Sequence, residues 1–188
     1  KNGYGTELSE VIETIEEQQI YDAKELKEFF WNMFIADTLV GNFDRHNGNW
    51  GFLIDEEKQR VEIAPIYDCA SCLYPQLTDE RIREIINDED ETNARVYVFP
   101  TSALKIKGKK INYFGFITGL ENEECNKALI RIFPKINLEK IYKIIKNLKQ
   151  QGYTIICITN LADEILLADR TLVLEQGKIA LEVVNISI

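Results

Sequence analysis

The sequence lacks any run of about 18 or more apolar residues, the length that a membrane-spanning helix needs, so we expect no membrane segment. Residues 1–5 are not followed by the apolar stretch of a secretory signal. Cysteine is scarce too: Cys69, Cys72, Cys125 and Cys157 form no disulfide framework in a chain of 188 residues. We therefore expect a cytoplasmic protein in a reducing environment.

Basic residues are outnumbered by acidic ones. The 22 Lys and Arg against 31 Asp and Glu give a formal net charge of −9. Such a surface repels a phosphate backbone, so we expect no direct nucleic-acid partner. Hydrophobic residues make up 45% of the chain, which is enough for a folded core rather than a disordered tail.

Helical periodicity is clear in the first 41 residues. The apolar spacing predicts a helix over about residues 6–19. A second helix is expected to begin at Asp22, which with Glu25 forms a capping-box pattern, and to end at Gly41. Its wide aromatic face predicts that this helix lies in the core.

The rest of the chain mixes short strands with helices. Two β-rich runs, residues 50–54 and 61–64, flank a polar turn and predict a hairpin. Beyond it we expect a helix over 78–86, a solvated acidic loop over 88–91, an extended stretch near 96–99, a basic loop over 105–110, and helices over 121–133 and 138–151. A metal site in the acidic run is the weaker interpretation, because adjacent carboxylates repel one another without a cation.

The C-terminal residues have a different sequence pattern from the helical segments before them. Residues 154–159 form a β-branched run typical of a buried strand, 162–168 predict a short helix, and 171–174 predict another strand before a turn at 176–178. The predicted fold class is therefore α+β: a mainly helical domain with one β-hairpin, followed by a small β-α-β tail.

Asp44 and Asn49 lie five positions apart between the long helix and the hairpin. Phosphoryl transfer uses this pair, since a carboxylate accepts the proton of the attacking hydroxyl and an amide oxygen helps to hold Mg²⁺. Asp68, at the far end of the hairpin, can supply the second metal carboxylate. The isolated spacing is weak, because Asp, Asn and Gly also cluster in ordinary turns. The surrounding helix, hairpin and Asp68 favour the catalytic interpretation.

Residues 22–86 closely resemble the C-terminal lobe of HipA-type serine/threonine kinases, the toxins of bacterial persistence modules. The motifs that carry the resemblance are Ile35-Ala36-Asp37, Gly41-Asn42-Phe43-Asp44-Arg45-His46-Asn47-Gly48-Asn49 and Ala64-Pro65-Ile66-Tyr67-Asp68. It continues more weakly to about residue 145. The resemblance implies a protein-kinase-like C-lobe that uses ATP and Mg²⁺ and phosphorylates a protein substrate, with Asp44 as catalytic base and Asn49 and Asp68 as Mg²⁺ ligands. The D-R-H-x-x-N string also resembles phosphoinositide kinases, so a lipid kinase stays an alternative.

Neighbouring side chains carry weaker functional hypotheses. His46, the only histidine, is a candidate for positioning Asp44 or a phosphate, although bonding within the loop is favoured. Arg45 is expected to have a structural role, such as pairing with a backbone carbonyl, rather than neutralising Asp44. Cys69 and Cys72 have zinc spacing, but without further ligands we interpret them as small buried side chains near the metal loop.

A kinase of this type also needs an N-terminal lobe with a strand Lys and a loop over the nucleotide. Residues before Asp22 predict one helix and no such sheet. Residues 1–146 are thus expected to form a HipA-like C-lobe without its N-lobe. The N-lobe would be part of a longer kinase that includes this chain, or would come from a separate chain. An antitoxin is another expected partner. A non-catalytic interaction module derived from a kinase lobe is the alternative from a different class.

Residues 147–188 are expected to be a separate tail fragment. Within it, residues 148–160 and 168–179 resemble the end of an ABC-transporter ATPase domain. Asn160 stands where that family has a His, and the chain has no G-x-x-x-x-G-K-[ST] loop. We therefore expect no ATP hydrolysis by the tail.

Overall fold

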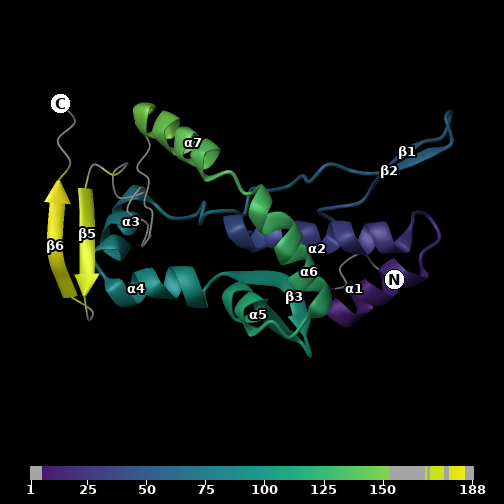
Figure 1. Cartoon of the computed structure of the whole chain (residues 1–188), viewed down its shortest axis with the longest axis horizontal. Coiled ribbons are helices and arrows are strands. Elements are labelled where there is room, and N and C mark those ends of the chain that lie inside the picture. The colour runs from purple at the N-terminus through teal and green to yellow at the C-terminus, as the bar shows by residue number, and fades with distance from the viewer. Residues whose placement is uncertain (1–5, 153–167, 169, 176–177, 185–188) are drawn as a thin grey trace. The chain divides into compact units, whose positions relative to one another are not determined.

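The computed structural model describes residues 6–152, 168, 170–175 and 178–184 (Figure 1). The chain divides into two compact units, one of residues 1–77 and 93–135 and the other of residues 78–92 and 136–188. All candidate site residues belong to the first unit. None of the described helices is long and apolar enough to cross a membrane.

Two helices open the first unit, as predicted. Helix α1 (Leu8–Glu17) leads to α2 (Ala23–Val40), whose first turn is capped by Asp22, which accepts a hydrogen bond from the Glu25 amide at 2.8 Å. Gly41 ends α2 in the left-handed region at φ 59°, where a residue without Cβ is favoured. The local cap signals therefore set both ends of α2 correctly.

The core of this unit surrounds α2. Helices α1 and α6 (Glu123–Ile132) both contact α2 (Figure 1). Residues of β3 (Thr101–Ile106), β4 (Lys109–Asn112) and α5 (Tyr113–Gly119) complete the cluster. Its buried members are Leu8, Val11, Ile15, Leu26, Phe30, Trp31, Met33, Phe34, Ile35, Leu104, Ile111, Tyr113, Cys125 and Ala128. Burial of this many large side chains is the main stabilising contribution, at about 1.5–3 kcal/mol for each large apolar group.

Hairpins are more numerous than predicted. The expected pair, β1 (Phe52–Asp55) and β2 (Arg60–Ile63), is antiparallel, with Phe52 opposite Ile63. The prediction of one hairpin is wrong, because β3 (Thr101–Ile106) and β4 (Lys109–Asn112) form a second antiparallel pair where a basic loop was expected over 105–110. The Glu7 carboxylate accepts hydrogen bonds from the backbone amides of the β3–β4 turn, at 2.6 Å from Lys107 and 3.0 Å from Gly108. This contact across about 100 residues of sequence has no local signal.

The stretch near 96–99 is helical, not extended as predicted. It lies in a single wide turn, η1 (Ala94–Val98), closed by a hydrogen bond from the Phe99 amide to the Ala94 carbonyl at 2.7 Å. The side-chain amide of Asn112 donates to the carbonyls of Tyr97 and Val98, so the carbonyl oxygens at the end of the turn have hydrogen-bond donors. Tertiary contacts thus override the β propensity of the run. Two further elements, α5 (Tyr113–Gly119) and the 3₁₀ turn η2 (Phe133–Lys135), were not predicted.

The second unit contains α3 (Asp79–Ile86) and α7 (Leu138–Gln150), both predicted, and the start of α4 (Glu89–Asn93). The acidic run is therefore helical rather than a solvated loop, since Asp88 accepts from the Glu91 amide and caps the turn. The predicted strand at 171–174 lies within β5 (Arg170–Glu175), which pairs antiparallel with β6 (Lys178–Val184). The strand predicted over 154–159, Asn160 and all but the last residue of the helix predicted over 162–168 lie outside the described residues.

Candidate active site

The candidate residues come from two connected segments of the first unit. Asp44 and Asn49 lie in the loop between α2 and β1, and Asp68 lies in the segment that follows β2. Asp44 and Asp68 are exposed, whereas Asn49 is buried with 5% of its surface accessible. Both carboxylates are therefore open to a ligand, and the amide belongs to the packed interior of the loop.

A buried ion pair holds the first segment to α2. The Arg45 Nε donates to Asp37 Oδ2 at 2.9 Å and its Nη2 donates to Asp37 Oδ1 at 3.0 Å, a bidentate arrangement. Both side chains are almost fully buried. Burial alone would lower the pKa of Arg45, but the hydrogen bonds and charge of Asp37 outweigh it and raise the pKa. Arg45 is thus a permanent cation at the centre of the loop.

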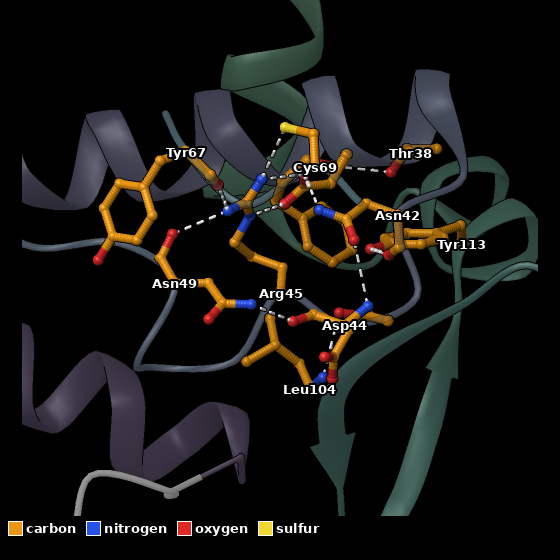
Figure 2. A network of polar contacts seen from close by, with 12 residues as sticks. Thr38, Asn42, Asp44, Arg45, Asn49, Tyr67, Cys69, Leu104 and Tyr113 are labelled. Atoms are coloured by element: carbon orange, nitrogen blue, oxygen red, sulfur yellow. Dashed lines mark hydrogen bonds and ion pairs between the residues drawn. The ribbon is translucent and has the colours of Figure 1, made fainter. Parts of the chain in front are cut away.

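The same guanidinium joins the two segments that carry the candidate ligands. Its Nη1 donates to the backbone carbonyl of Asn49 at 2.8 Å and also to the carbonyl of Tyr67, the residue before Asp68. Figure 2 shows Arg45 in the middle of this network, with Asn49 and Tyr67 on one side. Arg45 therefore pairs with backbone carbonyls, as predicted, and brings the Asn49 and Asp68 segments together on one nitrogen atom.

The amide of Asn49 has a defined orientation. Its Nδ2 donates to the backbone carbonyl of Asp44 at 2.8 Å, which leaves its Oδ1 as the atom suited to a cation. The Asn49 backbone amide also donates to the His46 carbonyl at 3.0 Å. The side chain thus closes the loop from Asp44 to Asn49 while its oxygen keeps its capacity as a ligand.

His46 has contacts inside the loop that fix its ring and its backbone. Its Nδ1 accepts a hydrogen bond from the Gly48 amide at 3.0 Å, and its own amide donates to the Asp44 carbonyl at 2.9 Å. A Cβ at Gly48 would lie 2.9 Å from the imidazole ring, so any other residue there would make the His46 ring shift. These contacts agree with the favoured interpretation of His46 as a residue that shapes the loop.

Asp68 has an unusual backbone conformation. Its φ of 54° lies in the left-handed region, and Leu73 and Tyr74, both at 57°, follow within the same segment. Asp tolerates this region better than most residues, whereas the two bulkier side chains store strain. Strain of this kind persists where the surroundings fix the backbone, and here the Arg45 contact to the Tyr67 carbonyl is adjacent to Asp68.

The prediction that the two cysteines after Asp68 are buried is wrong. Cys69 is exposed and Cys72 is half-buried, because the chain over residues 65–70 lies at the surface. Desolvation and the neighbouring Cys69 raise the pKa of the Cys72 thiol to about 11. Within the described part of the chain, no three His, Cys, Asp or Glu side chains are grouped to hold a metal ion. A cation near the loop would have to use the Asn49 amide together with carboxylates.

Sequence reasoning missed three residues that position the loop. Asn42, fully buried, donates from Nδ2 to Asp37 Oδ1 at 2.9 Å and accepts from the Asp44 amide at 3.2 Å. Tyr113 on α5 donates its hydroxyl to the Asn42 carbonyl at 2.6 Å. A signal existed only for Asp37: it continues the core face of Phe30 and Met33 at helical spacing, and a carboxylate at such a position needs a partner.

Replacing Tyr113 by Phe is expected to cost about 1–3 kcal/mol in the free energy of unfolding, because the Asn42 carbonyl loses a buried donor. Burial raises the pKa of Tyr113 well above its ordinary 10.0, against an opposing hydrogen bond with Ser102. The folded protein then keeps the phenol proton at pH values where the unfolded chain releases it, so stability falls as the pH rises above about 10. Urea unfolding at pH 8 and pH 10.5 measures both effects. If the Tyr113→Phe variant showed the same alkaline loss as the parent, this assignment would be contradicted.

Comparison with known proteins identifies clear relatives. The family model described as the HipA-like C-terminal domain matches residues 1–151. The serine/threonine-protein kinase CtkA of Helicobacter pylori is 51% identical over 148 residues, which cover 78% of this chain and 46% of CtkA. The crystal structure of the H. pylori proinflammatory kinase CtkA matches with a TM-score of 0.75 and 51% identity, over 78% of this chain and 54% of that chain. The chain thus spans about half the length of these relatives.

The tail stays without such support. The family match ends at residue 151, so it does not support the resemblance of residues 147–180 to an ABC-transporter ATPase domain. That resemblance, and a domain boundary between 146 and 147, stay predictions.

Proposed function

The chain belongs to the HipA-like C-terminal domain family, and on this basis we propose that it forms the catalytic lobe of an ATP- and Mg²⁺-dependent kinase. The proposed acceptor is a serine or threonine hydroxyl of a protein, the class of acceptor that the name of CtkA implies. The proposed partners are this substrate, a nucleotide-covering N-lobe in the same or a separate chain, and an antitoxin, all in the cytoplasm.

The position of each side chain supports its proposed role. Asp44 is exposed, and its backbone makes the hydrogen bonds to Asn42 and Asn49, so its carboxylate can accept a proton from the attacking hydroxyl. The Asn49 Oδ1 and the Asp68 carboxylate are hard oxygen donors, which suit Mg²⁺. When bound, the metal neutralises phosphate charge as the γ-phosphoryl group is transferred. His46 shapes the loop between Asp44 and Asn49.

One observation carries the proposal: Arg45 Nη1 donates to both the Asn49 and Tyr67 carbonyls. Two side chains can share a metal only if their backbones are held near each other. A single guanidinium, itself fixed by Asp37, supplies that link between two segments that the β1–β2 hairpin separates in sequence. An ordinary Asn- and Gly-rich turn has no need for this second connection.

Substituting Asp68 by Asn tests the metal role. Asn also tolerates the left-handed backbone, so the variant removes the charge and keeps the conformation. In a chimera in which this chain replaces the matched part of CtkA, we expect Mg²⁺-dependent nucleotide affinity to fall about tenfold or more. Isothermal titration with and without Mg²⁺ measures it. The control is Asp55→Asn, a carboxylate at the other end of the hairpin, which should leave binding unchanged. Equal affinities for the Asp68 variant and the parent would reject the role.

The exposed apolar side chains of β1 favour a second candidate, a non-catalytic interaction module. Leu53 and Ile54 are 54% and 63% exposed on consecutive positions of the strand, and such residues often contact a partner. The same titration separates the candidates. If neither the chain nor the chimera binds nucleotide with Mg²⁺, the module is favoured and the kinase proposal fails.

A further inference from the structure

Cys69 and Cys72 lie in one tight turn directly after Asp68. The Cys72 amide donates to the Cys69 carbonyl at 3.3 Å, which closes a four-residue turn. The Cα atoms at the ends of such a turn are less than about 7 Å apart, and disulfides span Cα separations up to about this value. The backbone therefore already brings the two cysteines within bridging distance.

The two cysteines are free thiols in this structure and differ in their access to solvent. Cys69 is exposed and can be reached by a small reagent, while Cys72 is half-buried. Cys125, by contrast, is buried on α6 with 2% of its surface accessible. Among the described cysteines, only this pair combines proximity with access.

We propose that Cys69 and Cys72 form a redox modification site, which closes to an intramolecular disulfide by exchange with a small-molecule disulfide such as glutathione disulfide. The Cys69 sulfur, as thiolate, attacks one sulfur of the reagent; the reagent S–S bond breaks, and one thiol leaves with a proton. The Cys72 thiol then loses its proton and attacks the Cys69 sulfur, and the second thiol is released. Two protein thiols are oxidised while one disulfide is reduced to two thiols.

The closure acts on the candidate active site. Arg45 Nη2 lies 3.6 Å from the Cys69 Sγ in the reduced protein, and the same guanidinium holds the Tyr67 carbonyl. A disulfide rotates the Cys69 sulfur toward Cys72 and constrains the backbone immediately after Asp68. This consequence rests on the proposed kinase function: closure displaces a metal ligand and lowers phosphoryl transfer.

Mass spectrometry tests the site without any activity. Trypsin releases residues 61–81 as one peptide that contains Cys69 and Cys72 and no other cysteine. After the reduced full chain is incubated with glutathione disulfide and then alkylated, we expect this peptide two hydrogen atoms lighter and without a glutathione adduct. Cys69→Ser and Cys72→Ser should each carry a glutathione on the remaining cysteine. A parent peptide that stays reduced, or that keeps glutathione without closing, overturns the proposal.

A second measurement separates this inference from the proposed function. In the CtkA chimera, the oxidised parent should transfer phosphate at least about tenfold more slowly than the reduced parent, as displacement of a reacting group predicts. The double variant Cys69→Ser/Cys72→Ser should show the same rate with and without oxidant. A disulfide that forms without a change in rate overturns the regulatory consequence. If the reduced chimera transfers no phosphate, the kinase proposal is overturned. The mass spectrometry of the cysteine peptide still tests the modification site in that case.

Discussion

Phosphoryl transfer is expected to fall by about 10²–10⁴-fold when Asp44 is replaced by Asn, the range for loss of a general base. The amide has nearly the shape of the carboxylate but cannot accept the hydroxyl proton. The loop should stay intact, because the Asp44 amide donates to Asn42 and its carbonyl accepts from Asn49 and His46. Transfer of labelled phosphate from ATP to a protein acceptor by the CtkA chimera measures the effect.

Two controls make the Asp44 result specific. Asp55→Asn should transfer phosphate at the parent rate, and Asp44→Asn should have the same free energy of unfolding as the parent, because Asp44 is exposed. Nucleotide affinity should change little, since Asp44 acts on the hydroxyl. Unaltered transfer by the Asp44 variant would reject the catalytic role, and transfer to lipid instead of protein acceptors would reassign the substrate.

Local signals explain what the sequence could predict of the fold. The Asp22 cap, the apolar face of α2 and Gly41 all act within a few residues, and the observed helix has those limits. The β1–β2 hairpin likewise follows from two adjacent runs around a polar turn. The positions of Asp44, Asn49 and Asp68 relative to these elements were therefore predictable.

The errors come from contacts between distant segments. The residues predicted as a basic loop over 105–110 form a hairpin whose turn is held by Glu7, about 100 positions earlier. The wide turn η1 is stabilised by Asn112, and Tyr113 reaches the loop from α5. No periodicity encodes such pairs. Burial of Asp37 could be suspected from its place on the α2 face, but its partner Arg45 became evident only in three dimensions.

Replacement of Arg45 by Met is expected to destabilise the fold by about 3–5 kcal/mol, because it leaves the Asp37 carboxylate buried without a cation. The Asn49 and Tyr67 carbonyls lose a donor in the same variant. Since small domains have only about 5–15 kcal/mol of stability, we expect a clearly lower urea midpoint. The exposed pair Lys58–Asp55 has the same 2.9 Å separation, so Lys58→Met is a matched control and should change the midpoint little.

A double substitution distinguishes an unpaired charge from lost packing. Asp37→Leu with Arg45→Met removes both charges, so it should be more stable than Arg45→Met alone, with a coupling energy of about 0.5–3 kcal/mol in the double-mutant cycle. Arg45→Lys keeps a cation but lacks the planar fork that contacts Asp37, Asn49 and Tyr67 together. That variant should weaken Mg²⁺-dependent nucleotide binding more than it lowers stability, because the metal segments are no longer held by one group. If Arg45→Lys bound nucleotide like the parent, the guanidinium would stabilise the fold without positioning the site.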